Sequence, residues 1–214
     1  ISHDKVTRFL HASDYGSKEL WCYVKPLVKE KERKAGGVLI LDDTVEEKAY
    51  TDENDLVCWH YSHAKGRHVK GINLLSCLAR YDDVSFPVGY TLVKKDVQYC
   101  DIASKKRKRK ASVTKNEQFR HLIKQVSDNQ VSFDYILADN WFAAKANMLF
   151  IHHDLEKQFI FGMKANRLAT LDANSGQFKP IKSLDLEEGK TKTLWLKGLD
   201  FPVQLLKKTF TNED

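Results

Sequence analysis

The stretch "GGVLILDDTVEEK" (residues 36–48) contains an apolar run that ends abruptly in two adjacent carboxylates. The run from Val38 to Leu41 is typical of a strand that is buried on both faces. Asp42 and Asp43 close this predicted strand, and Thr44 follows them. Such a pair is either a simple acidic turn or, at the end of a core strand, part of a metal site. The rest of the sequence discriminates between these two interpretations.

Composition limits the class of protein. The chain has 214 residues, of which 42% are hydrophobic, so it is long enough to build one sizeable core. No apolar run approaches the roughly 20 residues of a membrane span, and no signal-peptide pattern is present, so we expect a cytoplasmic protein without a membrane partner. The four cysteines form no C-x-x-C pair, which favours free, buried thiols. The chain starts without Met and stops without an obvious ending, so we expect a fragment.

The positive charge is concentrated in one block. The formal net charge is +6, and the run "KKRKRK" alone carries six positive charges. Its members are Lys105, Lys106, Arg107, Lys108, Arg109 and Lys110. Such a block either binds the phosphate backbone of a nucleic acid through counterion release or forms a solvated loop.

A second basic stretch, "HYSHAKGRHVKG" (residues 60–71), allows the same two interpretations, phosphate contact or a solvated connection. Its candidate DNA-binding residues are His63, Lys65, Arg67, His68 and Lys70. A zinc site at His60, His63 and His68 is disfavoured, because their spacing is irregular and no acid or cysteine completes the set.

The first half of the chain predicts helix, then strands. Residues 1–35 show helical spacing, with a break or kink predicted at Pro26. After the strand at 38–41, the charged residues 46–70 predict a long excursion. The runs 71–81 and 84–95 then predict a β-hairpin around Asp82-Asp83, with an edge or a bulge near Pro87.

The second half alternates helix and strand. Thr114 and Glu117 form a capping box that begins a strong amphipathic helix. Tyr135 to Ala138 is an apolar strand with Asp139 at its end, and residues 141–154 predict another helix. Residues 158–164 predict a further strand, and the remainder is β-rich.

This order, a β-meander followed by α-β-α-β, is that of a ribonuclease-H-like mixed α/β sheet. In that topology the strand before Asp43 and the strand before Asp139 are parallel neighbours, so both acids emerge at one edge. Two close carboxylates are tolerated when a hard cation such as Mg²⁺ lies between them. Alternatively, Asp139 simply caps a helix that begins near Trp141. Trp141 itself either packs near a bound substrate or is a plain core aromatic.

Four blocks carry a family resemblance: "LILDDT", "HVKGINLLSCL…VSFPVGY", "TKNEQFR" and "YILADNWFAAKANMLFI". Together they closely resemble the catalytic domain of DDE transposases of bacterial insertion sequences, over roughly residues 36–165. The resemblance implies that Asp43 and Asp139 are the first two catalytic acids and metal ligands, with Asp42, Thr44 and Trp141 as possible auxiliary residues. It implies Mg²⁺ or Mn²⁺, with two ions once a third acid is present. That acid is a Glu in a Y-x-x-R-x-x-x-E-x-x-x-x-x-x-K block, which this chain lacks.

The resemblance also implies a function and a division of the chain. We expect a transposase core that cleaves phosphodiester bonds and transfers strands at the ends of insertion sequences. Its partner would be double-stranded DNA, bound by a homodimer at the bacterial nucleoid. The expected parts are a helical segment from a DNA-binding or linker region (1–35), the catalytic core (36–165) and an incomplete β-rich insertion (166–214). The alternatives are an inactive DNA-binding remnant and another ribonuclease-H-like nuclease, against which the long β-rich tail argues.

Overall fold

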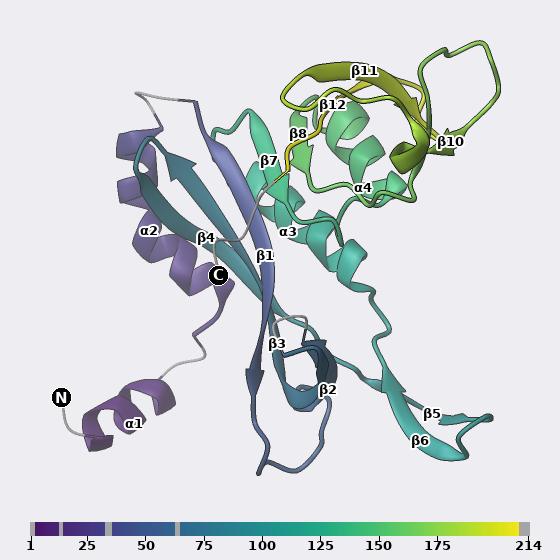
Figure 1. The fold of residues 1–214 in the computed structure, drawn as a ribbon. Coiled ribbons are helices and arrows are strands. Elements are labelled where there is room, and N and C mark those ends of the chain that lie inside the picture. Colours follow the sequence, from purple (N-terminus) through teal and green to yellow (C-terminus); the bar gives the residue numbers. More distant parts are fainter. Residues whose placement is uncertain (1–2, 13–14, 33–35, 63–64, 210–214) are drawn as a thin grey trace.

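A mixed sheet forms the centre of the protein (Figure 1). The computed structural model describes residues 3–12, 15–32, 36–62 and 65–209. The strands of the main sheet are β1 (Val38–Glu47), β2 (Cys58–Ser62), β3 (Arg67–Tyr81), β4 (Val84–Leu92), β7 (Tyr135–Ala138) and β8 (Gln158–Phe161). Their order is β2-β3-β1-β7-β8, with β4 also paired to β3. Since β1 is antiparallel to β3 and parallel to β7, the ribonuclease-H-like fold is confirmed.

Helices cover one face of this sheet. The helical segments are α1 (His3–His11), α2 (Ser17–Lys31), α3 (Lys115–Asp128), α4 (Lys145–Leu149) and a π-helical turn (Phe150–Asp154), of which α1 lies apart from the sheet (Figure 1). Leu39 and Leu41 of β1 are fully buried and belong to one core cluster with residues of α2 and α3. The neighbouring Val38 and Ile40, on the opposite side of the pleat, are only half-buried. The prediction of a strand buried on both faces is therefore wrong, because the helices pack against one face.

Strand β1 is longer than its apolar run. It pairs with β3 along its whole length, from Val38 opposite Arg80 to Glu47 opposite Gly71. The two carboxylates therefore lie within a strand rather than in a turn. The predicted excursion over 46–70 is wrong in part: residues 48–57 form neither helix nor strand, but β2 and the beginning of β3 follow and extend the sheet beyond the carboxylates.

Other local predictions have mixed outcomes. The β3–β4 hairpin is confirmed, with Asp82 in the turn at φ 50° and a register shift between Cys77 and Leu78. The capping box of α3 is also confirmed. Helix α2 runs through Pro26 without a break, since its residues Trp21 and Val28 are anchored in the core.

Two further predictions need correction. The helix expected from residue 141 begins at Lys145, because residues 139–144 form a turn. All four cysteines are free as predicted, but Cys22 and Cys100 are exposed rather than buried.

The C-terminal part forms a second small sheet, the C-terminal unit. Its strands are β9 (Leu168–Thr170), β10 (Lys179–Pro180), β11 (Thr191–Leu196) and β12 (Val203–Leu206), with a 3-10 turn at Ile181–Ser183. The order is β10-β9-β11-β12. Met148 of α4 packs into its core with Ala169, Leu194 and Leu196. The β-rich C-terminal insertion is therefore confirmed, while the three domain boundaries stay a prediction.

The basic block is a strand rather than a loop. Strands β5 (Val97–Asp101) and β6 (Lys106–Lys110) pair as an antiparallel hairpin, with Lys105 in the turn at φ 53°. Figure 1 shows this hairpin projecting from the body of the molecule, at the lower right. Among the described residues, no helix is long and apolar enough to cross a membrane.

Candidate active site

The carboxyl group of Asp43 lies at the N-terminus of α3. Asp43 falls on the same side of the pleat as Leu39 and Leu41, the side that the helices cover. Its Oδ2 accepts hydrogen bonds from Lys115 Nζ at 2.6 Å and from Asn73 Nδ2 at 2.7 Å. The ion pair is well shielded, since the Lys115 and Asp43 side chains are 22% and 18% exposed.

The position of Lys115 follows from the cap of its helix. Thr114 is the N-cap of α3, and its side chain accepts a hydrogen bond from the backbone N–H of Glu117. The Glu117 carboxylate in turn accepts from the backbone N–H of Thr114 at 2.7 Å. Since this reciprocal cap fixes the first turn of the helix, Lys115 emerges from a defined point directly opposite Asp43.

Asp139 reaches the same site from the neighbouring strand. The parallel register pairs Leu41 with Ala138, so Asp139 follows β7 at the level of the β1 carboxylates. Its Oδ1 accepts a hydrogen bond from the backbone N–H of Trp141 at 2.9 Å. The residue before α4 is Ala144, so the alternative that Asp139 caps this helix is wrong; Asp139 closes a turn.

A buried polar cluster attaches this turn to α3. Asn147 is fully buried, and its Nδ2 donates to Phe142 O at 2.9 Å and to Asn116 Oδ1 at 2.7 Å. Its Oδ1 accepts from Arg120 Nη1 at 2.7 Å. One amide therefore connects the turn that carries Asp139 to the first turns of the helix that carries Lys115.

The carboxylates repel one another. Burial of the carboxyl group raises the pKa of Asp42, although much of the residue is exposed, and the nearby charges of Asp43 and Asp139 raise it further. Asp42 Oδ1 also accepts the backbone N–H of Asp43 at 2.9 Å. Across the described residues, no three His, Cys, Asp or Glu side chains converge closely enough to form a metal centre.

The donor set nevertheless fits one hard cation. Asp43 and Asp139 supply only carboxylate oxygens, and Mg²⁺ is typically held by one or two carboxylates together with water and phosphate oxygens. The positively charged Lys115 ammonium lies against the Asp43 carboxylate. A divalent cation bound at this place would neutralise the negative charge of the acids in the same way. The site as described is therefore suited to a divalent ion whose remaining ligands come from solvent and substrate.

Both acids open into one large pocket, the acid pocket, with a volume of about 860 Å³. One wall carries Asp43, Asp139 and Trp141, and another is formed by the basic strand β6. The charged side chains that line it are the cations Lys95, Lys106, Arg107, Lys108, Arg109 and Lys115 and the acids Asp43, Glu53 and Asp139. Because these cations outnumber the acids, the pocket attracts a polyanion despite its carboxylates.

The predicted basic residues of β6 divide into two groups. Arg109 bonds Asp55 at 2.5 Å and so attaches the hairpin to the segment before β2, whereas Lys108 bonds Asp101 at 2.6 Å within the hairpin. Lys106 and Arg107 line the pocket and form no ion pair with a described residue, which leaves them available to a ligand. Lys105 and Lys110 lie outside the pocket lining.

The second basic stretch contributes less than predicted. Lys65 and Arg67 both bond Glu47 and are not among the residues that line the acid pocket, and neither is Lys70. His68 lines the pocket and packs edge-on against Tyr61. His63 lies outside the described residues, and Thr44 is exposed on β1 outside the pocket lining.

Three residues of the site were not predicted from the sequence in their present role: Lys115, Asn73 and His60. Lys115 follows the capping threonine in "TKNEQFR", and this first helical position, inside a block that resembles the family, was the available signal. His60 is buried beside Cys58 Sγ at 3.2 Å. Burial, then the charges of Lys95 and Lys115, lower the pKa of His60 to about 4, so its imidazole is neutral at pH 7.

Comparison with known proteins identifies the family. A family model described as "DDE superfamily endonuclease" matches residues 1–182, and the chain therefore belongs to that family. This membership makes the protein a nuclease-type enzyme and confirms the resemblance at the level of the superfamily. No curated protein and no solved structure matches the chain significantly.

Proposed function

We propose that this chain is the catalytic core of a DNA transposase, which cleaves phosphodiester bonds at the ends of an insertion sequence and joins them to target DNA. One observation carries the proposal: Asp43 and Asp139, on neighbouring parallel strands, open into one pocket whose other wall is the basic strand β6. Such an enzyme would act on double-stranded DNA at the bacterial nucleoid, as a homodimer that pairs two ends.

Each group in the pocket has a part in this chemistry. Asp43 and Asp139 would hold Mg²⁺ or Mn²⁺, and such an ion would supply Lewis-acid neutralisation of phosphate charge and activation of an attacking oxygen. Without metal, Lys115 and Asn73 hold the Asp43 carboxylate by two hydrogen bonds to one oxygen, and a bound cation would take the place of Lys115 at that oxygen. Lys106 and Arg107 bind the phosphate backbone, and the buried, neutral His60 lines the pocket without adding charge to it.

A second candidate is a catalytically inactive DNA-binding remnant. The observation that favours it is that, within the described part of the chain, no third acid converges with Asp43 and Asp139 closely enough to hold a metal with them. Both candidates predict salt-sensitive DNA binding through β6. Only the enzyme predicts metal-dependent cleavage.

Plasmid nicking tests the proposal. Supercoiled plasmid is incubated with the protein and Mn²⁺ or Mg²⁺, alongside Asp43→Asn, Asp139→Asn and the control Asp185→Asn, which changes an exposed acid of the C-terminal unit. We expect nicking by the wild type and the control, and its loss in both site variants. Binding without nicking in all four proteins would support the remnant, and equal nicking in all four would contradict the assignment of the acids.

A further inference from the structure

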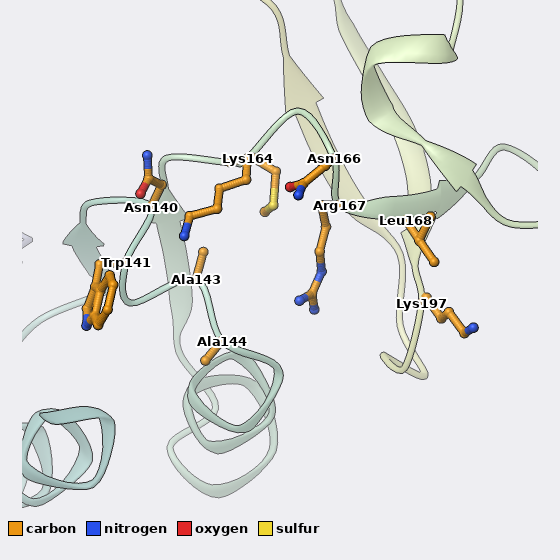
Figure 2. Close-up of a pocket in the computed structure, with 10 residues that line it drawn as sticks. Asn140, Trp141, Ala143, Ala144, Lys164, Asn166, Arg167, Leu168 and Lys197 are labelled. Atoms are coloured by element: carbon orange, nitrogen blue, oxygen red, sulfur yellow. The ribbon is translucent and has the colours of Figure 1, made fainter. Parts of the chain in front are cut away.

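A second pocket lies on the other side of Trp141. Its volume is about 450 Å³, and it lies between the turn after β7, the segment after β8 and the C-terminal unit (Figure 2). Its lining residues are Asn140, Trp141, Ala143, Ala144, Met163, Lys164, Asn166, Arg167, Leu168 and Lys197. Trp141 also lines the acid pocket, so both pockets border this side chain.

The second pocket is positively charged. Lys164, Arg167 and Lys197 line it, and no acid is among the described residues that do so. Figure 2 shows Lys164 extending toward Trp141, and its Nζ lies 5.6 Å from the centre of the indole ring. Asn140 and Asn166 add amide groups that can donate hydrogen bonds. This set of groups favours an anionic ligand.

Arg167 gives the strongest indication of a ligand. Its Nε and Nη2 are buried, and no described residue accepts a hydrogen bond from either atom. The backbone around it is fixed, since its N–H donates to Lys164 O at 3.0 Å and its carbonyl accepts from Ile181 N–H at 2.9 Å. A buried donor without an acceptor is costly, so a guanidinium held this way suits an oxyanion that bonds both nitrogens.

We propose that this pocket binds a phosphate group of the DNA strand that continues past Asp43 and Asp139, with Arg167 as its principal ligand. The inference rests on the proposed function, because that function supplies the strand. Phosphate is favoured because the planar guanidinium matches its oxygens in pairs. Since Trp141 lines both pockets, a strand bound at the acids passes directly from one to the other.

DNA binding measured without metal tests this assignment. Anisotropy of a labelled DNA duplex in EDTA, over a series of KCl concentrations, is compared for the wild type, Arg167→Gln and the control Lys182→Gln. Lys182 is exposed on the same unit but lies outside the pocket lining. We expect Arg167→Gln to weaken binding about tenfold and to reduce the salt slope by about 0.9, the value of one phosphate contact. Lys182→Gln should match the wild type.

Thermal unfolding separates binding from a structural role. Because Nε and Nη2 bond no described residue, Arg167→Gln should not lower the melting temperature. A lower melting temperature with unchanged affinity and slope would show a structural role and overturn the proposal. Inorganic phosphate is a second probe: stabilisation of the wild type but not of Arg167→Gln, with equal DNA affinity, would indicate a free-anion site and also overturn it.

A further variant distinguishes this inference from the proposed function. Lys106→Gln/Arg107→Gln changes the wall of the acid pocket and should weaken DNA binding on its own. If this double variant binds weakly while Arg167→Gln equals the wild type, only the inference about the second pocket fails. If the wild type binds no DNA, both fail.

Discussion

Removal of the Lys115 ammonium tests how much its bond to Asp43 contributes to the stability of the folded protein. In Lys115→Met the stem of the side chain is kept, and Asp43 loses a charge-assisted hydrogen bond of 2.6 Å. Both side chains are about one-fifth exposed, so solvent replaces the bond poorly. A bond of this kind contributes about 2 kcal/mol. For a chain of this size, the melting temperature should fall by about 4–8 °C.

The matched control is on the same helix. Lys124 pairs with Asp128 at 3.0 Å, but the two side chains are 63% and 62% exposed. Lys124→Met should therefore change stability by less than about 0.5 kcal/mol. Calorimetry of the three proteins in EDTA gives the comparison, and equal melting temperatures for wild type and Lys115→Met would refute the reasoning.

Divalent metal adds a second readout. In the wild type, Lys115 and a bound cation compete for Asp43 Oδ2, whereas in Lys115→Met the cation has no such competitor. Mn²⁺ should therefore raise the melting temperature of the variant more than that of the wild type, because a ligand that binds the folded state more tightly stabilises it more at the same concentration. An identical rise in both proteins would show that Lys115 does not occupy the metal position.

Three further predictions concern the surroundings of the site. The pKa of His60 is about 4 in the folded protein, whereas in the unfolded chain the same imidazole binds its proton near pH 6.5. The free energy of unfolding should therefore fall by about 3 kcal/mol as the pH drops from about 6.5 to about 4. Urea unfolding at several pH values should show a weaker dependence in His60→Phe. Asn147→Leu leaves the half-buried Arg120 guanidinium without its acceptor and should destabilise the protein by about 2 kcal/mol in the same assay. In Gly71→Ala the new Cβ would collide with the carbonyl oxygen of Glu46, so the β1–β3 pairing must shift. Denaturation followed by circular dichroism should show that the free energy of unfolding falls by at least about 3 kcal/mol. Wild-type stability of this variant would contradict the close approach of the two strands.

Local sequence signals predicted which helices and strands form better than they predicted the residues at which these begin and end. The capping residues Thr114 and Glu117 act within one turn, so they marked the start of α3 correctly. Strand β1 extends past its apolar residues because β3 supplies partners for its backbone as far as Glu47. That pairing depends on a segment far along the chain, and hydrophobic periodicity does not report it.

The site was predicted in part for the same reason. The parallel pairing of β1 and β7 follows from topology, so the common location of Asp43 and Asp139 could be expected. The Lys115–Asp43 bond joins residues 72 positions apart, and no local pattern reports it. The unpaired guanidinium nitrogens of Arg167 are evident only once burial is known.

The β5–β6 hairpin determines where the excess positive charge of the chain lies. The formal net charge of +6 equals the charge of the block at residues 105–110, so the rest of the chain is balanced. As a solvated loop this block would attract polyanions without directing them. As strand β6, paired with β5 and attached by Arg109 to Asp55, it forms one wall of the pocket that contains Asp43 and Asp139. The excess charge of the molecule is thereby fixed opposite its carboxylates, where it offsets the repulsion that they exert on a phosphate backbone.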